Sequence, residues 1–391
     1  IVVRVIDAQI GRIDHKVRNT LQQLSHVPPA VVDINENKAV FYQIQLMEMT
    51  KANMRGDNKG AAYHKLYLDK FAKREPGLSL QLKRKYSNMR YNPETLRSLY
   101  VKNSCVDILF ETCLFLQFLN EKLGRDSINN SKLLLSVYNV PELDNAFFTG
   151  EYMLYGNGHK NFYPLSAIDV AAHELTHGLV QTTAGLEYKG HSGALNESFA
   201  DVIATAFEFW LYAKFNTNAD TTDDLQGEAD WLLGEDIGKT TAYLRNLRDP
   251  TKADMPQPKL YKGQHWSNPN DANRDHGGVH INSGISNHCF YLLSEKTDID
   301  TALPIFYNCL LKLGARSDFI DFRNTLVSCA PESLKVSVQK CLDVVGLTIN
   351  TVSDWDLSPT KNKTPNPNSV PQQSKRLSYP NSHIPYLRNS C

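Results

Sequence analysis

Apolar residues recur at the spacing of helices through most of the second half of the chain. Recurrence at intervals of three and four residues is typical of amphipathic helices. Long loops at 216–230 and 249–278 interrupt the pattern, and such loops are usually functional or disordered. The pattern predicts a mainly helical lobe. Its helical segments are residues 168–183, 193–215, 280–296, 298–314, 318–330 and 331–346.

The first half of the chain mixes strand and helix patterns. Residues 2–17 alternate like an edge strand running into a glycine turn, 131–140 form a strand pattern, and 145–158 an edge strand with a glycine turn. Residues 101–124 predict one helix that ends at Gly124. Residues 31–100 are basic and compatible with strands or with short helices. Because 391 residues exceed one small domain, we expect an α+β protein of two lobes, the first of them mixed α/β.

The composition excludes several classes of protein. With 41% hydrophobic and 21% charged residues the chain is globular rather than fibrous or wholly disordered. Its 42 basic residues balance 42 acidic ones, so the protein has no net positive charge that would attract nucleic acid, and we expect it to bind none. The sequence holds no apolar run of 18 residues, so we expect no membrane span. The tail at 351–391 is rich in Pro, Asn and Ser, which predicts disorder.

The seven cysteines form no metal-binding or redox motif. Their odd number prevents complete pairing, and none lies in a CxxC pattern. Cys329 and Cys341 flank a predicted turn and could bridge two helices. The alternative is that both are buried free thiols, which are common in protein cores.

The segment His173-Glu174-Leu175-Thr176-His177 carries the first candidate chemistry. On a helix, residues four apart share a face, so both imidazoles can point at one metal ion. The carboxylate of Glu174 can then reach a water molecule at that ion. Alone, the motif also fits two surface histidines on an amphipathic helix.

A second acidic helix supplies a candidate third ligand. Glu197 follows His177 by twenty positions and lies in the otherwise apolar segment GALNESFADVIATAFEF. A buried carboxylate is costly unless it is paired or bound to a metal. Two histidines and one glutamate with an open fourth position are the ligand set of catalytic zinc sites. Asp201, one turn further on, can orient a ligand imidazole.

These segments resemble the thermolysin-type neutral zinc metallopeptidases, a family of gluzincins. HELTHG, GLEYKGHSGALNESFAD, GEDI, YLRNLRDP and DHGGVHINSGISN occur in the family's order and approximate spacing over residues 124–346. The resemblance implies a two-lobe fold with the active-site cleft between an N-terminal α/β lobe and a helical C-terminal lobe. It also implies an endopeptidase that cleaves protein or peptide substrates.

The resemblance assigns roles to individual residues. It implies one catalytic zinc held by His173, His177 and Glu197, with Glu174 as general base. Asn196 and Asp201 match the residues that orient the imidazoles of His177 and His173. Tyr188 and His280 match the donors that stabilise the oxyanion, and Asp275 matches the carboxylate behind His280. Arg245 matches the residue that binds the substrate carbonyl, and Asn145 with Ala146 match the contacts to the substrate backbone.

The resemblance further implies one or two structural calcium ions and an apolar specificity pocket. The calcium residues would be Asp169, Glu208, Asp230 and Glu235, and Leu232 replaces one further acidic residue of the family. Clustered buried carboxylates need a cation. The pocket would hold Leu, Ile, Val or Phe after the scissile bond, although its residues also fit a plain core. They are Phe162, Leu165, Val170, Leu233, Ile237 and Leu244.

The N-terminus and residues 31–100 depart from the family's pattern. Residues 31–100 lack its Gly-rich, strand-rich opening, and Phe148 stands where a Trp is usual. Residues 2–20 resemble the end of an inhibitory propeptide, which implies a zymogen whose mature enzyme begins near 26–40. The expected domains are therefore a propeptide remnant and linker (1–30), an N-terminal lobe (31–166), a helical lobe (167–350) and the tail (351–391).

Localisation and assembly are expectations from the family alone. The chain has no initiator Met and holds no signal segment, which suggests that it is cut from a longer protein. The resemblance implies a secreted monomer that its own propeptide inhibits. Two alternatives remain open: a gluzincin exopeptidase, and a catalytically inactive binding protein that keeps the fold.

Overall fold

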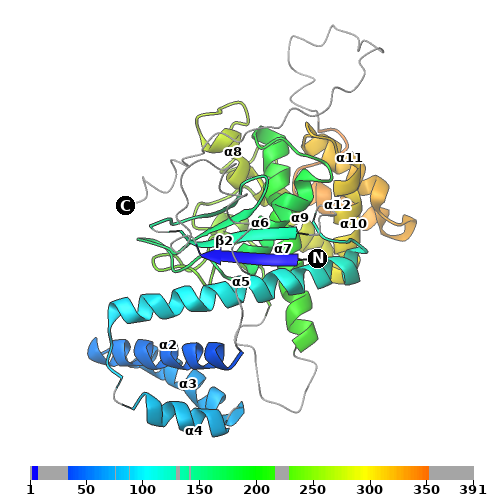
Figure 1. Cartoon of the computed structure of the whole chain (residues 1–391). Helices are drawn as coiled ribbons and strands as arrows, with labels where there is room; N and C mark the ends of the chain where they lie inside the picture. The colour runs from blue at the N-terminus through cyan, green and yellow to red at the C-terminus, as the bar shows by residue number, and fades with distance from the viewer. Residues whose placement is uncertain are drawn as a thin grey trace.

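The computed structural model describes residues 2–7, 34–74, 76–87, 89–128, 133–140, 142–215 and 229–351. A small sheet and four helices build the N-terminal lobe, and a larger set of helices builds the C-terminal lobe (Figure 1). Residues 8–33, 216–228 and 352–391 lie outside the described residues. They include most of the predicted propeptide remnant and linker (1–30), most of the loop at 216–230 and all of the predicted tail (351–391) except residue 351.

The N-terminal lobe contains a four-stranded mixed sheet with the order β1-β2-β4-β3. Strand β1 (Val2–Asp7) runs parallel to β2 (Leu133–Val140), in register from Val2 opposite Leu133 to Asp7 opposite Tyr138. Strand β4 (Met153–Gly156) runs parallel to β2, and β3 (Ala146–Phe148) runs antiparallel to β4. The predicted edge strand is confirmed over residues 2–7, and the rest of it, with its glycine turn, lies outside the described residues. The strand predicted at 131–140 is confirmed over 133–140, whereas 145–158 forms two strands rather than one.

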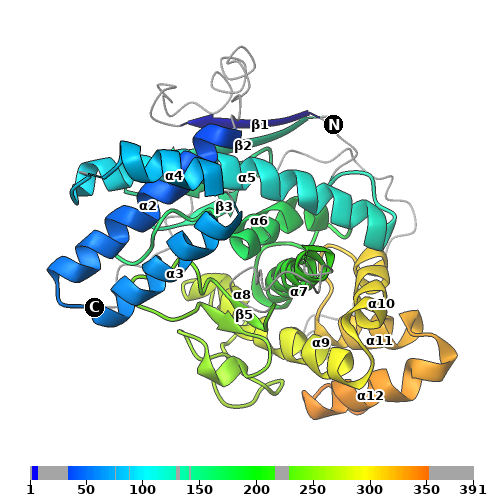
Figure 2. The same cartoon turned by 90° about the horizontal axis from the view of Figure 1, so that it is seen from below.

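Within residues 31–100, where the sequence was compatible with strands or with short helices, the structure has helices. They are α2 (Ile34–Met54), α3 (Asn58–Arg74) and α4 (Pro76–Lys85). Two small apolar clusters hold them, one around Ile44 and Met47 and the other around Tyr42, Phe71 and Leu82. Figures 1 and 2 place these helices beside α5 (Pro93–Leu123), on the side away from the C-terminal helices α9 to α12.

Helix α5 begins at Pro93 rather than at the predicted residue 101. The side chain of Asn92 caps it by accepting from the Thr95 backbone N–H at 2.9 Å, and proline at the first helical position needs no such partner. The helix ends at Gly124 as predicted, because this glycine adopts the left-handed conformation with φ 61°. Phe115 and Phe118 of α5 pack on Phe207 at ring-centroid distances of 5.4 and 5.6 Å, which joins the two lobes.

The C-terminal lobe is built around α7 (Gly190–Phe215), which Figure 2 shows end-on among its neighbours. The remaining helices are α6 (Ile168–Gln181), α8 (Asp275–Asn282), α9 (Gly284–Lys296), α10 (Ile299–Lys312), α11 (Phe319–Cys329) and α12 (Lys335–Val344). The predicted helix at 280–296 is thus divided at Ser283. Short elements complete the lobe: β5 (Leu232–Leu233) with β6 (Arg245–Asn246), and the 3₁₀ turns η1 (Pro250–Lys252) and η2 (Glu332–Leu334).

Two further observations concern cysteines and membranes. Cys329 and Cys341 are free thiols rather than a disulfide; Cys341 is buried, as the alternative expected, whereas Cys329 is only half-buried. Among the helices that the structure describes, none combines the length and apolar character that crossing a membrane requires.

Candidate metal centre

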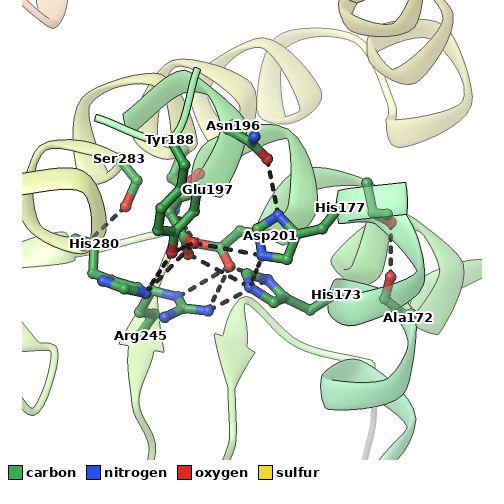
Figure 3. Close-up of polar contacts among 12 residues, drawn as sticks. Ala172, His173, His177, Tyr188, Asn196, Glu197, Asp201, Arg245, His280 and Ser283 are labelled. Carbon is green, nitrogen blue, oxygen red and sulfur yellow. Dashed lines mark hydrogen bonds and ion pairs between the residues drawn. The ribbon is translucent and has the colours of Figure 1, made fainter. Parts of the chain in front are cut away.

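Helices α6 and α7 pack together and bring the three predicted zinc ligands to one point (Figure 3). His173 and His177 lie one turn apart on α6, and their Nε2 atoms are 3.0 Å apart. Each Nε2 is 3.5 Å from an oxygen of Glu197 on α7. Tetrahedral ligands at zinc distances of 2.0–2.1 Å lie about 3.3 Å from one another. The spacing therefore fits one zinc ion.

The other nitrogen of each imidazole has a polar partner. His173 Nδ1 lies 2.9 Å from Asp201 Oδ1, and His177 Nδ1 lies 2.8 Å from Asn196 Oδ1. Because both partners are acceptors, each Nδ1 carries a hydrogen and the lone pair sits on Nε2 in the neutral ring. In the neutral rings, two lone pairs and a carboxylate face the same point, and a cation would satisfy them. Without a cation, Asp201 and Glu197 outweigh burial and raise the His173 pKa to about 10, so this ring carries a proton instead.

Glu197 is fully buried, and its Oε2 has no hydrogen-bond partner. Burial alone would raise its pKa, but the imidazoles of His280, His177 and His173 outweigh burial and hold the pKa well below the ordinary value. The group is therefore a carboxylate at neutral pH. A buried carboxylate with one oxygen lacking a hydrogen-bond partner, beside two imidazoles, is the donor set that a divalent metal satisfies.

Glu174 is buried beside this centre, and its Oε2 also lacks a partner. Burial raises its pKa to about 7, and Glu197 adds to the rise, whereas His173 and a hydrogen bond from the Phe148 backbone act the other way. A carboxyl whose pKa lies near neutrality can both accept and release a proton.

Tyr188 and His280 enter the site from the side opposite α6. The Tyr188 hydroxyl donates to Glu197 Oε1 and lies 3.1 Å from His280 Nε2. His280 Nδ1 lies 2.6 Å from Asp275 Oδ1. Burial lowers the His280 pKa, but Glu197 and Asp275 raise it more, so the net shift is upward. The arrangement provides a phenol and an imidazolium as donors at one place.

Arg245 lies behind the centre, in strand β6. Its guanidinium donates to Asp201 Oδ1 at 3.0 Å through Nε and at 2.8 Å through its terminal nitrogen. Arg245 and the His173 hydrogen bond lower the Asp201 pKa, against the effect of burial. Asn287 donates to the second Asp201 oxygen at 2.8 Å. Sequence reasoning missed Asn287, which lies in the family-like segment HINSGISN.

The turn before His280 adopts a conformation that the sequence signals only in part. Asp275, His276, Gly277 and Gly278 all have positive φ, between 50° and 88°. A Cβ on Gly277 would overlap the Pro269 carbonyl oxygen, so the two glycines fit the tight turn. His276 packs its ring on Tyr188 at a centroid distance of 5.8 Å. Sequence reasoning missed this contact because His276 belongs to no ligand pattern.

The predicted calcium residues also gather, with one difference. Oxygens of Glu208, Asp230 and Glu235 lie within 4.8 Å of one another, whereas Asp169 does not belong to that group. Burial raises the pKa of Glu208 to about 10, with Asp169 and Glu235 adding to the rise. Asp169 accepts hydrogen bonds from the backbone of Gly234 and of Val170. Asp169 therefore holds the backbone at Gly234, directly before Glu235.

Acidic groups near this cluster were missed by sequence reasoning. Asp236 is exposed and follows Glu235 directly. Glu111 of α5 is buried, and burial together with Asp107 raises its pKa well above the ordinary value. No spacing pattern predicts Glu111, because helix α5 precedes the motif segment.

The predicted substrate-binding residues lie in two places: the start of β3 and the main apolar cluster. Asn145 is half-buried before β3, and Ala146 begins this strand, whose pairing is with β4. Four predicted pocket residues are at most 4% exposed and belong to the main apolar cluster: Phe162, Leu165, Leu233 and Ile237. Val170 and Leu244 are half-buried and pack against the same cluster.

The chain is similar to known proteins over most of its described residues. Residues 35–181 match the family model described as thermolysin metallopeptidase, catalytic domain, and residues 184–346 match its alpha-helical domain. Neutral protease NprE of Bacillus pumilus is 36% identical over 234 residues, which cover 59% of this chain and 71% of that relative. Bacillolysin of Bacillus amyloliquefaciens is 36% identical over 256 residues, covering 63% of this chain and 45% of the relative.

A solved structure agrees with these matches. The precursor of protealysin, a metalloproteinase from Serratia proteamaculans, superposes with a TM-score of 0.53 at 29% sequence identity, covering 63% of this chain and 79% of that one. The fold and the site together define a two-lobe metalloprotein with a His₂Glu centre on two packed helices. The chain belongs to the thermolysin metallopeptidase family. It spans less than half the length of the Bacillolysin that it matches.

Proposed function

We propose that this protein is a zinc-dependent endopeptidase that hydrolyses peptide bonds on the amino side of large hydrophobic residues. The observation that carries the proposal is the convergence of His173, His177 and Glu197, whose ligand atoms lie within 4.8 Å of one another. Two imidazoles and one carboxylate leave the fourth tetrahedral position open, as in catalytic rather than structural zinc sites.

Zinc held by these ligands would lower the pKa of water to about 7 and polarise the substrate carbonyl. Glu174 acts as the general base: it takes a proton from the water that attacks the carbonyl carbon. It then delivers this proton to the amide nitrogen as the C–N bond breaks. The buried carboxyl with a pKa of about 7 suits both steps.

Tyr188 and His280 stabilise the negative charge that develops on the former carbonyl oxygen. The hydroxyl and the protonated imidazole lie 3.1 Å apart and are fixed before substrate arrives, so little reorganisation is required. Asp275 keeps the His280 ring oriented and charged. Arg245 has donors beyond those used by Asp201, and these bind a substrate carbonyl.

The edge strand and the apolar pocket select the substrate. Asn145 and Ala146 bind its backbone, because β3 ends the described sheet and an extended peptide can add to such an edge. The six residues predicted for the apolar pocket receive the substrate side chain that follows the scissile bond. Burying a leucine or phenylalanine there contributes about 1.5–3 kcal/mol.

Calcium completes the proposed cofactors. Glu208, Asp230 and Glu235 would bind one ion through carboxylate oxygens, the ligands that calcium prefers. Asp169 adds negative charge and fixes the loop that carries Glu235. Secretion, the monomeric state and inhibition by an N-terminal propeptide stay predictions from the resemblance.

Cleavage of an internally quenched peptide with leucine after the scissile bond tests the proposal. We expect hydrolysis on the amino side of leucine that a zinc chelator stops, that added zinc restores, and that Glu174→Ala abolishes. Glu151→Gln serves as the control: it also removes one negative charge, but from an exposed residue, and it should leave the rate unchanged. Folded, zinc-loaded protein that cleaves no peptide would favour the inactive binding protein, and release of single terminal residues would favour an exopeptidase.

A further inference from the structure

Asp144 forms a dense set of contacts that no predicted role accounts for. Its carboxylate accepts hydrogen bonds from four consecutive backbone N–H groups, those of residues 159–162. Oδ2 accepts from Lys160 at 2.8 Å and from Asn161 at 2.9 Å. Oδ1 accepts from His159 and, at 3.3 Å, from Phe162. A carboxylate has about four acceptor positions and no donor, so it matches this set of amides.

The residues on either side of these hydrogen bonds belong to the substrate site. Asp144 directly precedes Asn145 and Ala146, the proposed contacts to the substrate backbone. The last of the four amides is that of Phe162, a proposed pocket residue that is 4% exposed. The carboxylate of Asp144 therefore connects the backbone-binding strand to the pocket.

The turn at 157–163 is packed closely against the chain that carries Asp144. Gly156 N–H donates to the Asn145 carbonyl at 2.9 Å, and Gly158 N–H donates to the Leu143 carbonyl at 3.2 Å. A Cβ on Gly156 would overlap the Leu143 carbonyl oxygen, so the close approach requires glycine there. The carboxylate of Asp144 thus meets amides that are already held nearby.

The opposite side of the turn contacts the segment that carries another pocket residue. Tyr163 N–H donates to the Ile237 carbonyl at 2.9 Å, and Lys239 N–H donates to the Asn161 carbonyl at 2.8 Å. The Lys239 ammonium donates to the His159 carbonyl at 2.9 Å. The turn therefore lies between Asp144 on one side and residues 237–239 on the other.

We propose that Asp144 is a positioning residue that sets the specificity of the site, by fixing the distance between the substrate-binding strand and the pocket formed at Phe162 and Ile237. The part of this inference that concerns selection among peptide substrates rests on the proposed function. When the carboxylate loses its charge or two of its acceptor positions, the turn shifts relative to β3. The pocket then no longer lines up with a peptide bound along the strand, and selection among side chains weakens.

Asp144→Asn tests the inference with two readouts. The amide is the same size but presents an NH₂ group to backbone donors. In hydrogen exchange, we expect the amides of residues 159–162 to exchange at least about tenfold faster than in the parent protein. In peptide hydrolysis, we expect the preference for leucine over alanine after the scissile bond to fall at least about threefold, mainly through a higher KM. Asp126→Asn, the same change on an exposed carboxyl, should alter neither readout.

The outcomes separate the positioning role from a structural one. Unchanged exchange at 159–162 would overturn the inference outright. Faster exchange with an unchanged leucine-to-alanine preference would reduce Asp144 to a structural residue and also overturn it. If the parent protein hydrolyses no peptide, the proposed function fails, while exchange still decides whether Asp144 holds the turn. Should Asp144→Asn not fold, Lys239→Met loosens the same turn from its other side, and an unchanged preference there would count against the inference.

Discussion

Asp201 Oδ1 lies 2.9 Å from His173 Nδ1, and the aspartate side chain has no exposed surface. This contact fixes the orientation of the imidazole and leaves Nε2 as the metal-binding nitrogen. The aspartate is in turn held by Arg245 and Asn287, so the orientation of His173 depends on three elements.

Asp201→Asn should therefore weaken zinc binding without removing a ligand. An amide keeps the size of the side chain but accepts a weaker hydrogen bond from His173 Nδ1. We expect zinc affinity to fall about 10–100-fold, measured by competition with a chromogenic chelator. Asp126→Asn provides the matched control on an exposed carboxyl. Equal zinc affinity in both variants would show that the Asp201 contact does not orient the ligand.

Glu174→Gln should separate metal binding from catalysis. The glutamine fills the same space but cannot take a proton, so kcat should fall at least about 100-fold. Because Glu174 is not among the three grouped ligand residues, the zinc content should stay the same. The checks are peptide hydrolysis and metal analysis of one preparation. A variant that keeps its zinc and its activity would exclude Glu174 as the base.

Tyr188→Phe should lower kcat with little change in KM. The proposed role of the hydroxyl is to donate to the substrate oxygen as charge develops there, and loss of one such donor costs about 10²–10³-fold in rate. The ring still packs on His276 and His177, so the fold should be unaffected. Steady-state kinetics measure both constants. A raised KM at constant kcat would instead indicate a role in substrate binding.

Calcium removal should destabilise the protein, and Glu208→Gln should abolish this dependence. At a calcium concentration of about 100 times Kd, binding adds about 2.7 kcal/mol, which raises Tm by about 3–4 °C in a chain of this size. Without calcium the Glu208 carboxyl is protonated at neutral pH, since its pKa is raised to about 10, so the amide should cost little. Thermal unfolding with calcium and with a calcium chelator measures both effects. An equal calcium response in the variant would contradict the site.

Asp249 should contribute stability that depends on pH. Burial opposes ionisation, but hydrogen bonds from Lys259 and Thr251 lower its pKa to about 2. A folded-state pKa below the unfolded value of about 3.9 means that the contribution is present above pH ~4 and lost as pH falls toward 2. Asp249→Asn should cost about 1–2 kcal/mol at pH 7 and about half as much at pH 3. Urea unfolding at both pH values measures this, and an equal cost at both would refute the ion pair's role.

Much of the centre could be predicted because its residues lie on regular helices. The i, i+4 spacing of His173 and His177 places both rings on one face of α6, and the same periodicity places Glu197 and Asp201 together on α7. The strand at 131–140 and the end of α5 at Gly124 followed from alternation and from a glycine cap.

The residues that were missed depend on backbone geometry. Asp144 binds main-chain amides, which every residue except proline provides, so no side-chain pattern marks its partners. His276 reaches Tyr188 through a left-handed turn, a backbone conformation that no side-chain pattern around His276 marks. Residues 34–54, 58–74 and 76–85 form helices although their polar pattern fits strands as well, because the apolar contacts among α2, α3 and α4 decide the outcome.

The parallel pairing of β1 with β2 bears on the predicted cleavage near residues 26–40. Strand β1 lies at one end of the sheet and pairs with β2 along six residues. If the chain were cut within residues 26–40, release of the first piece would leave β2 with an open row of N–H and C=O groups, which is prone to associate with other strands. The same cut with the strand kept in place would give a nicked enzyme of two chains. In that case cleavage would break the covalent link between β1 and the rest of the chain, but the protein would keep the cut piece.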